Sequence, residues 1–399
     1  MNSSNSYKVP FIEFMIRSFI RGFSSLWLTF SCLVLGCVIV FWGTLAQVQM
    51  GLYRAQEEIF RSLFIYWHPA GFPWKIPVFP GGYLIGGLLL INLLVAHVRY
   101  YRPGKRKIGI VLVHLGIVLL LAGQMLTDGL SVESVMHLRL GQTRDYSESE
   151  RQSELAIVDV TDPKVEKVVA IPAQFLDRRS IFQPPGLSFQ VRIAAYRANS
   201  EVSMQPAPGF ERVQAAPGFG GDLWWRDAPS ETALDKTDVP SALVDIQTGS
   251  GSLGTFFVSE YFDKPQAFTW QGRSYELFLR ARRYYLPFSL KLLEFRHDRY
   301  PGTDIPKNFS SRVRLQCPAS GENREVLIFM NNPLRYDGAT FYQASFDPDD
   351  KGSVLQVVRN PGWLTPYFAC ALVGVGLIVQ FLIHLIPFLK ERSANETSH

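Results

Sequence analysis

The chain has 399 residues, of which 47% are hydrophobic and only 19% are charged. An aromatic content of 13% excludes an intrinsically disordered chain, because such chains are rich in charge and poor in aromatic residues. The apolar residues are concentrated in a few long windows, and these windows determine the class of protein.

Four windows carry no charged residue and are long enough to cross a bilayer, which takes about 20 apolar residues in a helix. We predict membrane-spanning helices at Leu26–Ala46, Gly82–Val98, Ile108–Thr127 and Pro366–Leu389, the first three within residues 26–127. The first window is too long, and begins too deep in the chain, for a cleaved signal peptide. We therefore expect the N-terminal segment to be retained.

The segments between the spans differ in charge, and this difference predicts their orientation. Loop 99–107 carries five positive charges and no negative one, and residues 1–25 carry a net charge of +2. Loop 47–81 carries +1, the tail 390–399 is neutral, and −3 remains for the 238 residues of 128–365. Because basic segments stay in the cytoplasm, both termini and loop 99–107 are predicted to be cytoplasmic. Loop 47–81 and segment 128–365 are then extracytoplasmic.

Residues 10–25 are predicted to form an amphipathic helix within the cytoplasmic segment 1–25. Phe11, Met15 and Phe19 recur at every fourth position, and a second line with the same spacing is charged. Such a helix lies in the plane of the membrane with its basic side towards anionic headgroups.

The extracytoplasmic segment 128–365 is predicted to be rich in β-strands. Runs of alternating apolar and polar residues, separated by Gly, Pro and Asp clusters, indicate antiparallel strands in a sandwich or an open barrel. The fold class is thus a membrane α+β protein, with four transmembrane helices and a large β-rich domain between the third and fourth. The stretch 199–240 is rich in Pro, Gly and Ala and predicts a long insertion loop. The predicted strands are Ser188–Tyr196, Ser274–Arg282, Ser289–Phe295, Ser311–Leu315, Glu325–Phe329, Thr340–Phe346 and Ser353–Val358.

Three histidines within the spans are the candidate functional residues, because a polar side chain in a bilayer is costly unless it has a partner or a function. His97, His114 and His384 all lie towards the predicted cytoplasmic ends of their spans, and His114 is about 9 Å deep. Neutral imidazole is a good ligand for haem iron. A histidine that bonds a carbonyl or reaches the headgroups is the favoured interpretation for His97 and His384. His114 is the haem-ligand candidate, since Gly116 and Gly123 allow another helix or a flat ring to approach closely.

Other polar and aromatic residues that stand out in the sequence are predicted to have structural roles. Asn92 and Gln124, both within spans, are predicted to form interhelical hydrogen bonds. The segment Trp224–Asp227 resembles tryptophan-rich haem-handling segments, but it lies in the insertion and lacks the longer tryptophan pattern, so it predicts a local packing cluster. The sequence has no CxxC or CxxCH motif, which excludes a thioredoxin-like oxidoreductase and a c-type cytochrome. No convincing catalytic site is contained in this chain alone.

The order of several short motifs resembles the ResB family, also called CcsB, of the system II cytochrome c biogenesis machinery. The resemblance extends over nearly the whole chain: three spans, one exported β domain and a closing span. Each motif is short, and their order together is specific. The motifs are Gly43–Gln47, Asn92–Leu94, His114–Ile117 with Gly123, Asn332–Gly338, Phe341–Phe346 and Asn360–Gly362.

The resemblance implies a subunit of a cytochrome c haem lyase (synthase) complex, not a complete enzyme. Proteins of this kind pair with a CcsA-type membrane protein, and together they move haem b across the membrane as a transient cargo. They attach it through thioethers to the CxxCH thiols of apocytochrome c. One transmembrane histidine of the ResB-type subunit serves as an axial haem ligand, and His114 matches that position. Basic residues of loop 99–107 would attract the haem propionates. The membrane would be the bacterial cytoplasmic (inner) membrane.

Two other functions stay open at this point. One is a transmembrane b-type cytochrome that passes electrons to quinone, with His114 and His384 as a bis-histidine pair. The other is a non-haem membrane scaffold whose exported β domain binds proteins, for example by adding an extended peptide to a strand edge.

Overall fold

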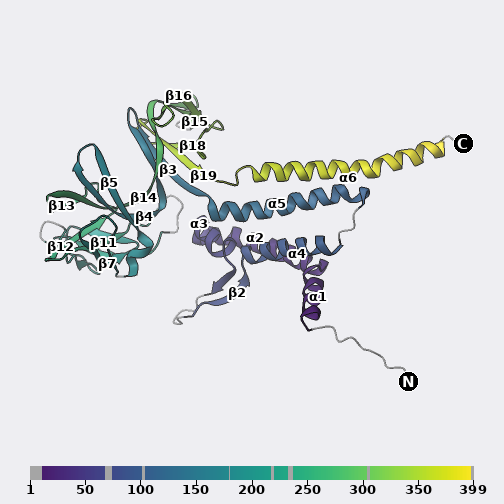
Figure 1. The fold of residues 1–399 in the computed structure, drawn as a ribbon, viewed down its shortest axis with the longest axis horizontal. Coiled ribbons are helices and arrows are strands. Elements are labelled where there is room, and N and C mark those ends of the chain that lie inside the picture. The colour runs from purple at the N-terminus through teal and green to yellow at the C-terminus, as the bar shows by residue number, and fades with distance from the viewer. Residues whose placement is uncertain are drawn as a thin grey trace, which may run out of the picture. The chain divides into compact units, whose positions relative to one another are not determined.

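The computed structural model divides the chain into a helical unit and a strand-rich unit (Figure 1). The helical unit comprises Met1–Ser131 and Asn360–His399, and the strand-rich unit comprises Val132–Arg359. The residues that the structure describes are 11–67, 74–100, 104–178, 180–216, 220–231, 237–302 and 306–396.

The helical unit contains four helices long and apolar enough to cross a membrane: α2, α4, α5 and α6. They coincide with the four predicted spans, and each helix extends beyond its predicted span because helical hydrogen bonding continues past the apolar window. A helix, α1, also forms within the predicted amphipathic segment. The elements are α1 (Phe11–Phe23), α2 (Leu26–Met50), α3 (Leu52–Ala55), the π-helical turn η1 (Gln56–Phe60), β1 (Phe64–Trp67), β2 (Ile76–Pro80), α4 (Gly82–Tyr100), the 3-10 turn η2 (Lys105–Lys107), α5 (Ile108–Leu130) and α6 (Thr365–Glu396).

Helices α5 and α6 lie side by side along a seam of glycines (Figure 1). Gly109, Gly116 and Gly123 are buried and recur every seven residues, so they lie on one face of α5. A Cβ atom at Gly116 would lie 2.6 Å from Cγ2 of Val373 and 2.8 Å from the carbonyl oxygen of Ala369. Of the two possibilities predicted for these glycines, the close approach of another helix is the one that the structure shows.

Asn92 fastens α4 to the corner between α1 and α2. Its side-chain amide donates to the carbonyl oxygen of Phe23 at 2.7 Å, and its Oδ1 accepts from Oγ1 of Thr29 at 2.6 Å. The predicted interhelical role of Asn92 is confirmed. The same prediction is wrong for Gln124, whose Nε2 donates to Asp128 of the same helix at 3.0 Å. Asp128, one turn further along α5, supplies an acceptor on the same face.

The strand-rich unit is antiparallel throughout its described pairings. A ten-stranded sheet has the order β16-β15-β14-β4-β3-β19-β18-β17, with β13 paired to β14 and β5 to β4; smaller sheets have the orders β12-β11-β7-β6 and β8-β10-β9. The elements are β3 (Val132–Arg139), β4 (Thr143–Asp162), β5 (Val165–Pro172), η3 (Ala173–Arg178), β6 (Ile181–Phe182), β7 (Gln190–Arg197), β8 (Ser200–Ser203), β9 (Glu211–Arg212), β10 (Trp224–Asp227), β11 (Ser241–Thr248), β12 (Gly251–Ser259), β13 (Gln266–Trp270), β14 (Arg273–Arg299), β15 (Pro306–Cys317), β16 (Glu322–Phe329), β17 (Leu334–Tyr336), β18 (Ala339–Phe346) and β19 (Gly352–Arg359).

The predicted strands Ser274–Arg282 and Ser289–Phe295 are parts of one strand, β14. Their separation is wrong, because the intervening residues 283–288, which include Pro287, continue the strand. The register between β14 and β4 shifts between Tyr285 and Leu290, so Pro287 lies where the ladder is irregular and its missing N–H is tolerated.

Two hydrophobic cores share the long strand β14, and β4 contributes to the first of them. In the first, the four-stranded sheet packs on the large sheet as a sandwich, and in the second the large sheet curls on itself. A bridge between Phe329 and Asn332 connects the end of β16 to the segment that enters β17. Both predicted architectures, a sandwich and an open barrel, are therefore present in one domain. Representative core residues are Leu155, Ile193, Phe256 and Leu277 in the first core, and Met136, Phe288, Leu315 and Phe341 in the second.

The insertion 199–240 is more ordered than the predicted loop, since it contains the sheet β8-β10-β9. Trp225 on β10 is 3% exposed and packs with Val213 and Phe257, and the Arg197 guanidinium lies 3.9 Å from the centre of its ring. The predicted packing cluster at Trp224–Asp227 is confirmed. The loop prediction is wrong here because the short strands lack a long alternating pattern.

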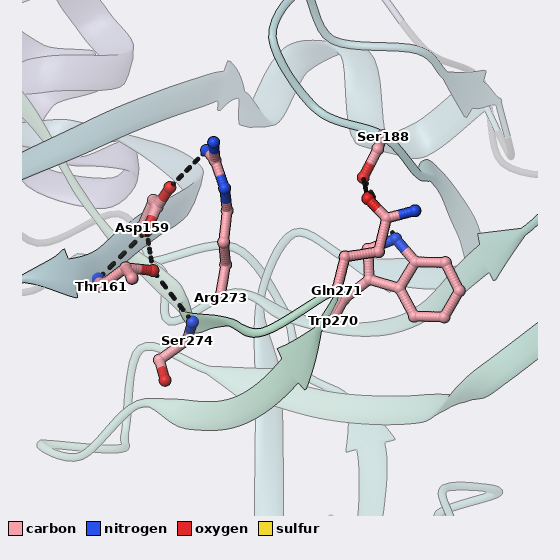
Figure 2. A network of polar contacts seen from close by, with 7 residues as sticks. All are labelled: Asp159, Thr161, Ser188, Trp270, Gln271, Arg273 and Ser274. Carbon is pink, nitrogen blue, oxygen red and sulfur yellow. Dashed lines mark hydrogen bonds and ion pairs between the residues drawn. The ribbon is translucent and has the colours of Figure 1, made fainter.

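Polar contacts surround the β13–β14 hairpin at one end of the first core (Figure 2). The β13–β14 hairpin turns at Gln271 and Gly272, both with positive φ, as a two-residue hairpin requires. Ser188 donates to Oε1 of Gln271 at 3.1 Å. Nearby, Asp159 accepts a hydrogen bond from Oγ1 of Thr161 at 2.5 Å, and this bond lowers the pKa of the Asp159 carboxyl.

Glu260 gives the strand-rich unit a testable pH dependence. Burial raises the pKa of Glu260, and a hydrogen bond from Ser153 at 2.8 Å opposes the shift. A raised pKa in the folded state contributes stability at low pH, and this contribution is lost as the pH rises through that pKa. Glu260→Gln is therefore expected to raise the melting temperature of the purified chain at pH 8 and to change it little at pH 4. An equal gain at both pH values, or the same pattern in the exposed control Glu150→Gln, would contradict this assignment.

Candidate functional site

Helices α4 and α5 bring two of the three predicted site histidines together. His97 lies in the last turn of α4, and His114 lies in the second turn of α5. Their ring centroids are 5.2 Å apart and the ring planes meet at 89°, in an edge-to-face arrangement. The pairing arises because the short segment 101–107 joins α4 and α5, so residues close to it on each helix meet. This spacing is the sequence signal that could have identified the pair.

The imidazole of His114 has an unused polar atom. Its Nδ1 is buried and has no hydrogen-bond partner. A buried polar atom without a partner costs about 1–3 kcal/mol, so an external ligand or partner would be stabilising here. His114 is two residues from Gly116, which places it about 200° around the helix from the seam with α6. The glycine seam and the histidine therefore use different faces of α5.

His384 has a different environment. It is exposed on α6, and its Nδ1 lies 2.8 Å from the carbonyl oxygen of Gln380 one turn earlier. A carbonyl oxygen only accepts, so Nδ1 carries the proton in this contact. Among the described residues, the ring of His384 makes no contact with that of His114. The structure thus places His114 with His97, not with His384.

The basic loop 99–107 is only partly described, since residues 101–103 lie outside the described ranges. Arg99 donates to Oγ of Ser24 at 2.7 Å and so ties α4 to the corner between α1 and α2. Arg106 and Lys107 are exposed at the start of α5. These two side chains are the described members of the loop that remain available to an anionic group.

The His97–His114 pair fits haem better than a metal ion bound by protein ligands alone. Within the described ranges, no group of three or more His, Cys, Asp or Glu residues is placed to hold a metal ion. Haem iron takes four ligands from its macrocycle and needs only one or two axial ligands from protein, for which imidazole is suited. The half-buried imidazole of His114, whose buried Nδ1 has no hydrogen-bond partner, meets that requirement. The donor set is therefore consistent with haem as a bound substrate.

Four apolar helices and a large β-rich unit define an α+β protein of the membrane class. Comparison with known proteins refines this class. Residues 266–353, which run from β13 to the start of β19, match the ResB-like family. A stretch of 97 residues is 42% identical to Protein NrfI of Wolinella succinogenes, and it covers 24% of this chain and 11% of that protein. The resemblance to the ResB family is thereby confirmed, and the family match rests on the strand-rich unit.

The family match and the histidines fall in different parts of the chain. The matched segment contains the predicted motifs Asn332–Gly338 and Phe341–Phe346. The motif His114–Ile117 lies outside the matched residues. The family match thus concerns the β-rich unit, whereas the candidate histidine site is defined by the geometry of α4 and α5.

Proposed function

We propose that this chain is the ResB-type subunit of a cytochrome c haem lyase complex, acting with a CcsA-type membrane protein. The match of residues 266–353 to the ResB-like family supports a role in cytochrome c biogenesis. In this proposal, the two proteins move haem across the membrane. They then attach it to apocytochrome c by adding the CxxCH thiols across the haem vinyl groups. This chain alone is not a complete enzyme.

The observation that carries the haem part of the proposal is the buried, unpartnered imidazole nitrogen of His114. In the complex, His114 holds the haem iron from the α4–α5 side, and the partner supplies the opposite axial ligand. His97 packs edge-to-face on His114 and restricts the orientations of its ring. Arg106 and Lys107 attract the propionates from the cytoplasmic side. Haem b is a transient substrate at this site.

The orientation of the chain is part of the same proposal. We place the chain in the bacterial inner membrane, and the charge asymmetry supports an orientation with both termini and loop 99–107 in the cytoplasm. The strand-rich unit then lies on the outer face, where apocytochrome c is matured. Its edge strands would offer unpaired backbone groups to an extended client segment.

The test is the absorption spectrum of the detergent-purified complex, co-expressed with a CcsA-type partner. We expect His114→Ala to lose most of the haem Soret absorbance while the complex remains intact on size-exclusion chromatography. Added imidazole should restore part of the band, because it replaces the missing ligand without repairing any packing defect.

His384→Ala is the matched control, since it removes a histidine from a span but leaves the His97–His114 pair intact. It should keep its Soret band. Unchanged haem in His114→Ala would assign the ligands to the partner and leave this chain a scaffold. Equal loss in the His114 and His384 variants would instead support a bis-histidine b-type cytochrome.

A further inference from the structure

The helical unit contains a pocket that is separate from the proposed haem site. It has a volume of about 470 Å³ and lies between the α3–η1 segment, the first turns of α4 and the last turns of α5. Volumes of about 300–1,000 Å³ are typical of sites for small organic ligands. The histidine pair lies towards the other ends of the same two helices, so the pocket is a separate site.

Two glycines on α4 give the pocket its width. Tyr83, Gly86 and Gly87 occupy one face of α4, at positions i, i+3 and i+4. A Cβ atom at Gly86 or Gly87 would meet no atom within 4 Å, so neither glycine is required for packing against another helix. They leave a bare strip of backbone along the pocket, and a planar ring can lie against such a strip.

Part of the pocket lining is apolar. Its walls include Leu52 and Phe60 on one side, and Leu121 and Met125 on α5. Leu121 lies seven residues from Asp128, which corresponds to about 10 Å along the helix. Leu52 and Met125 are 38% and 51% exposed, so in a membrane this side of the pocket faces lipid. A ligand with an apolar tail can enter from the bilayer.

The rim of the pocket is polar and offers no unpaired positive charge. The Arg61 guanidinium lies 3.0 Å from Glu57 and 3.5 Å from Asp128. Asp128 also accepts a hydrogen bond from Gln124 at 3.0 Å. Two carboxylates thus surround one cation, which disfavours a phosphate or propionate head. The rim nevertheless presents both neutral donors and a carboxylate acceptor.

We propose that this pocket binds an isoprenoid quinone or quinol. A quinone ring is neutral and planar, so it suits the bare glycine strip and a rim without free positive charge. Its carbonyl oxygens accept from the side-chain amides of Gln56 and Gln124, and the hydroxyl groups of the quinol form donate to Asp128. The isoprenoid tail leaves between Leu52 and Met125 into the bilayer. The proposal concerns binding, and it stands independently of the haem function.

The test is titration calorimetry of the purified full chain in detergent with decylubiquinone, a short-tailed quinone. We expect saturable binding at one site per chain. Gly86→Leu with Gly87→Leu fills the pocket and should weaken binding at least tenfold. The control Gly36→Leu adds one leucine on α2, where a Cβ also meets nothing within 4 Å, and should bind as the wild type does.

Thermal unfolding of each variant reports whether it is folded. If the double glycine variant does not fold, Gln56→Leu with Gln124→Leu tests the rim, and we expect a similar loss of affinity. Parallel titrations with hemin and with phosphatidylethanolamine identify the ligand class. Absence of saturable quinone binding, equal affinity in the pocket and control variants, or pocket-dependent binding of hemin or phospholipid in place of quinone would overturn the proposal.

Discussion

Replacing Gly116 by leucine is expected to prevent α5 and α6 from packing, with loss of most folded protein. The Cβ alone would lie 2.8 Å from the carbonyl oxygen of Ala369, a backbone atom that cannot rotate away. Overpacking commonly costs about 1–3 kcal/mol, and a whole leucine side chain against a helix backbone should reach or exceed the upper value. The measurement is the yield of monodisperse protein in detergent, together with its melting temperature.

Gly374→Leu is the matched control on α6, since a Cβ at Gly374 would meet no atom within 4 Å. Leucine has a higher helix propensity than glycine, by roughly 0.5–1 kcal/mol, so the control should be neutral or slightly stabilising. Equal yields and equal melting temperatures for the two variants would show that the glycine seam is not the contact between α5 and α6. The contrast thus separates close packing from any general effect of added bulk in a span.

Phe288→Ala is expected to destabilise the strand-rich unit by about 3–5 kcal/mol, as is typical of a large aromatic side chain removed from a core. Phe288 is 2% exposed, and its ring packs edge-to-face on Tyr336 and Phe341 at centroid distances of 4.8 and 5.9 Å. A domain of this kind has a total stability of about 5–15 kcal/mol, so the variant should be close to unfolding. Denaturant titration of the purified chain, followed by tryptophan fluorescence, measures the change.

The control for this prediction is Leu327→Ala on β16, which is separated from β14 by β15 in the same sheet. Leu327 is 47% exposed, and its removal should change stability by no more than about 0.5 kcal/mol. Leu155→Ala in the sandwich core should lower the same unfolding transition as Phe288→Ala, because the single strand β14 runs through both cores. Two separate transitions, each sensitive to one variant, would contradict this coupling.

The strands were predictable where one face is buried and the other is solvated. Thr340–Phe346 and Ser353–Val358 alternate in this way, and they correspond to β18 and β19. The continuity of β14 was not predictable, because a proline usually ends a strand. Pro287 is tolerated within β14 only because the register against β4 shifts there. The sheet inside the insertion was also missed, since its two- to four-residue strands depend on packing around Trp225.

The candidate site was also predictable only in part. The histidines were identifiable because polar residues stand out within apolar windows. The pairing of His97 with His114 could not be identified from the sequence, because it depends on how α4 and α5 face each other. His114 and His384 have similar predicted depths, but the contact forms between His114 and His97. The pocket beside Gly86 and Gly87 was equally hidden, since it is formed by three segments that are distant in the sequence.

The sequence by itself determined the four spans, the β-rich character of residues 128–365 and the resemblance to the ResB family. These properties depend on hydropathy, alternation and motif order, which are local along the chain. The tertiary structure decided which face of α5 meets α6, which imidazoles meet, and how two cores share β14. Those outcomes depend on contacts between residues far apart in the chain, where the shape of one partner selects the arrangement of the other.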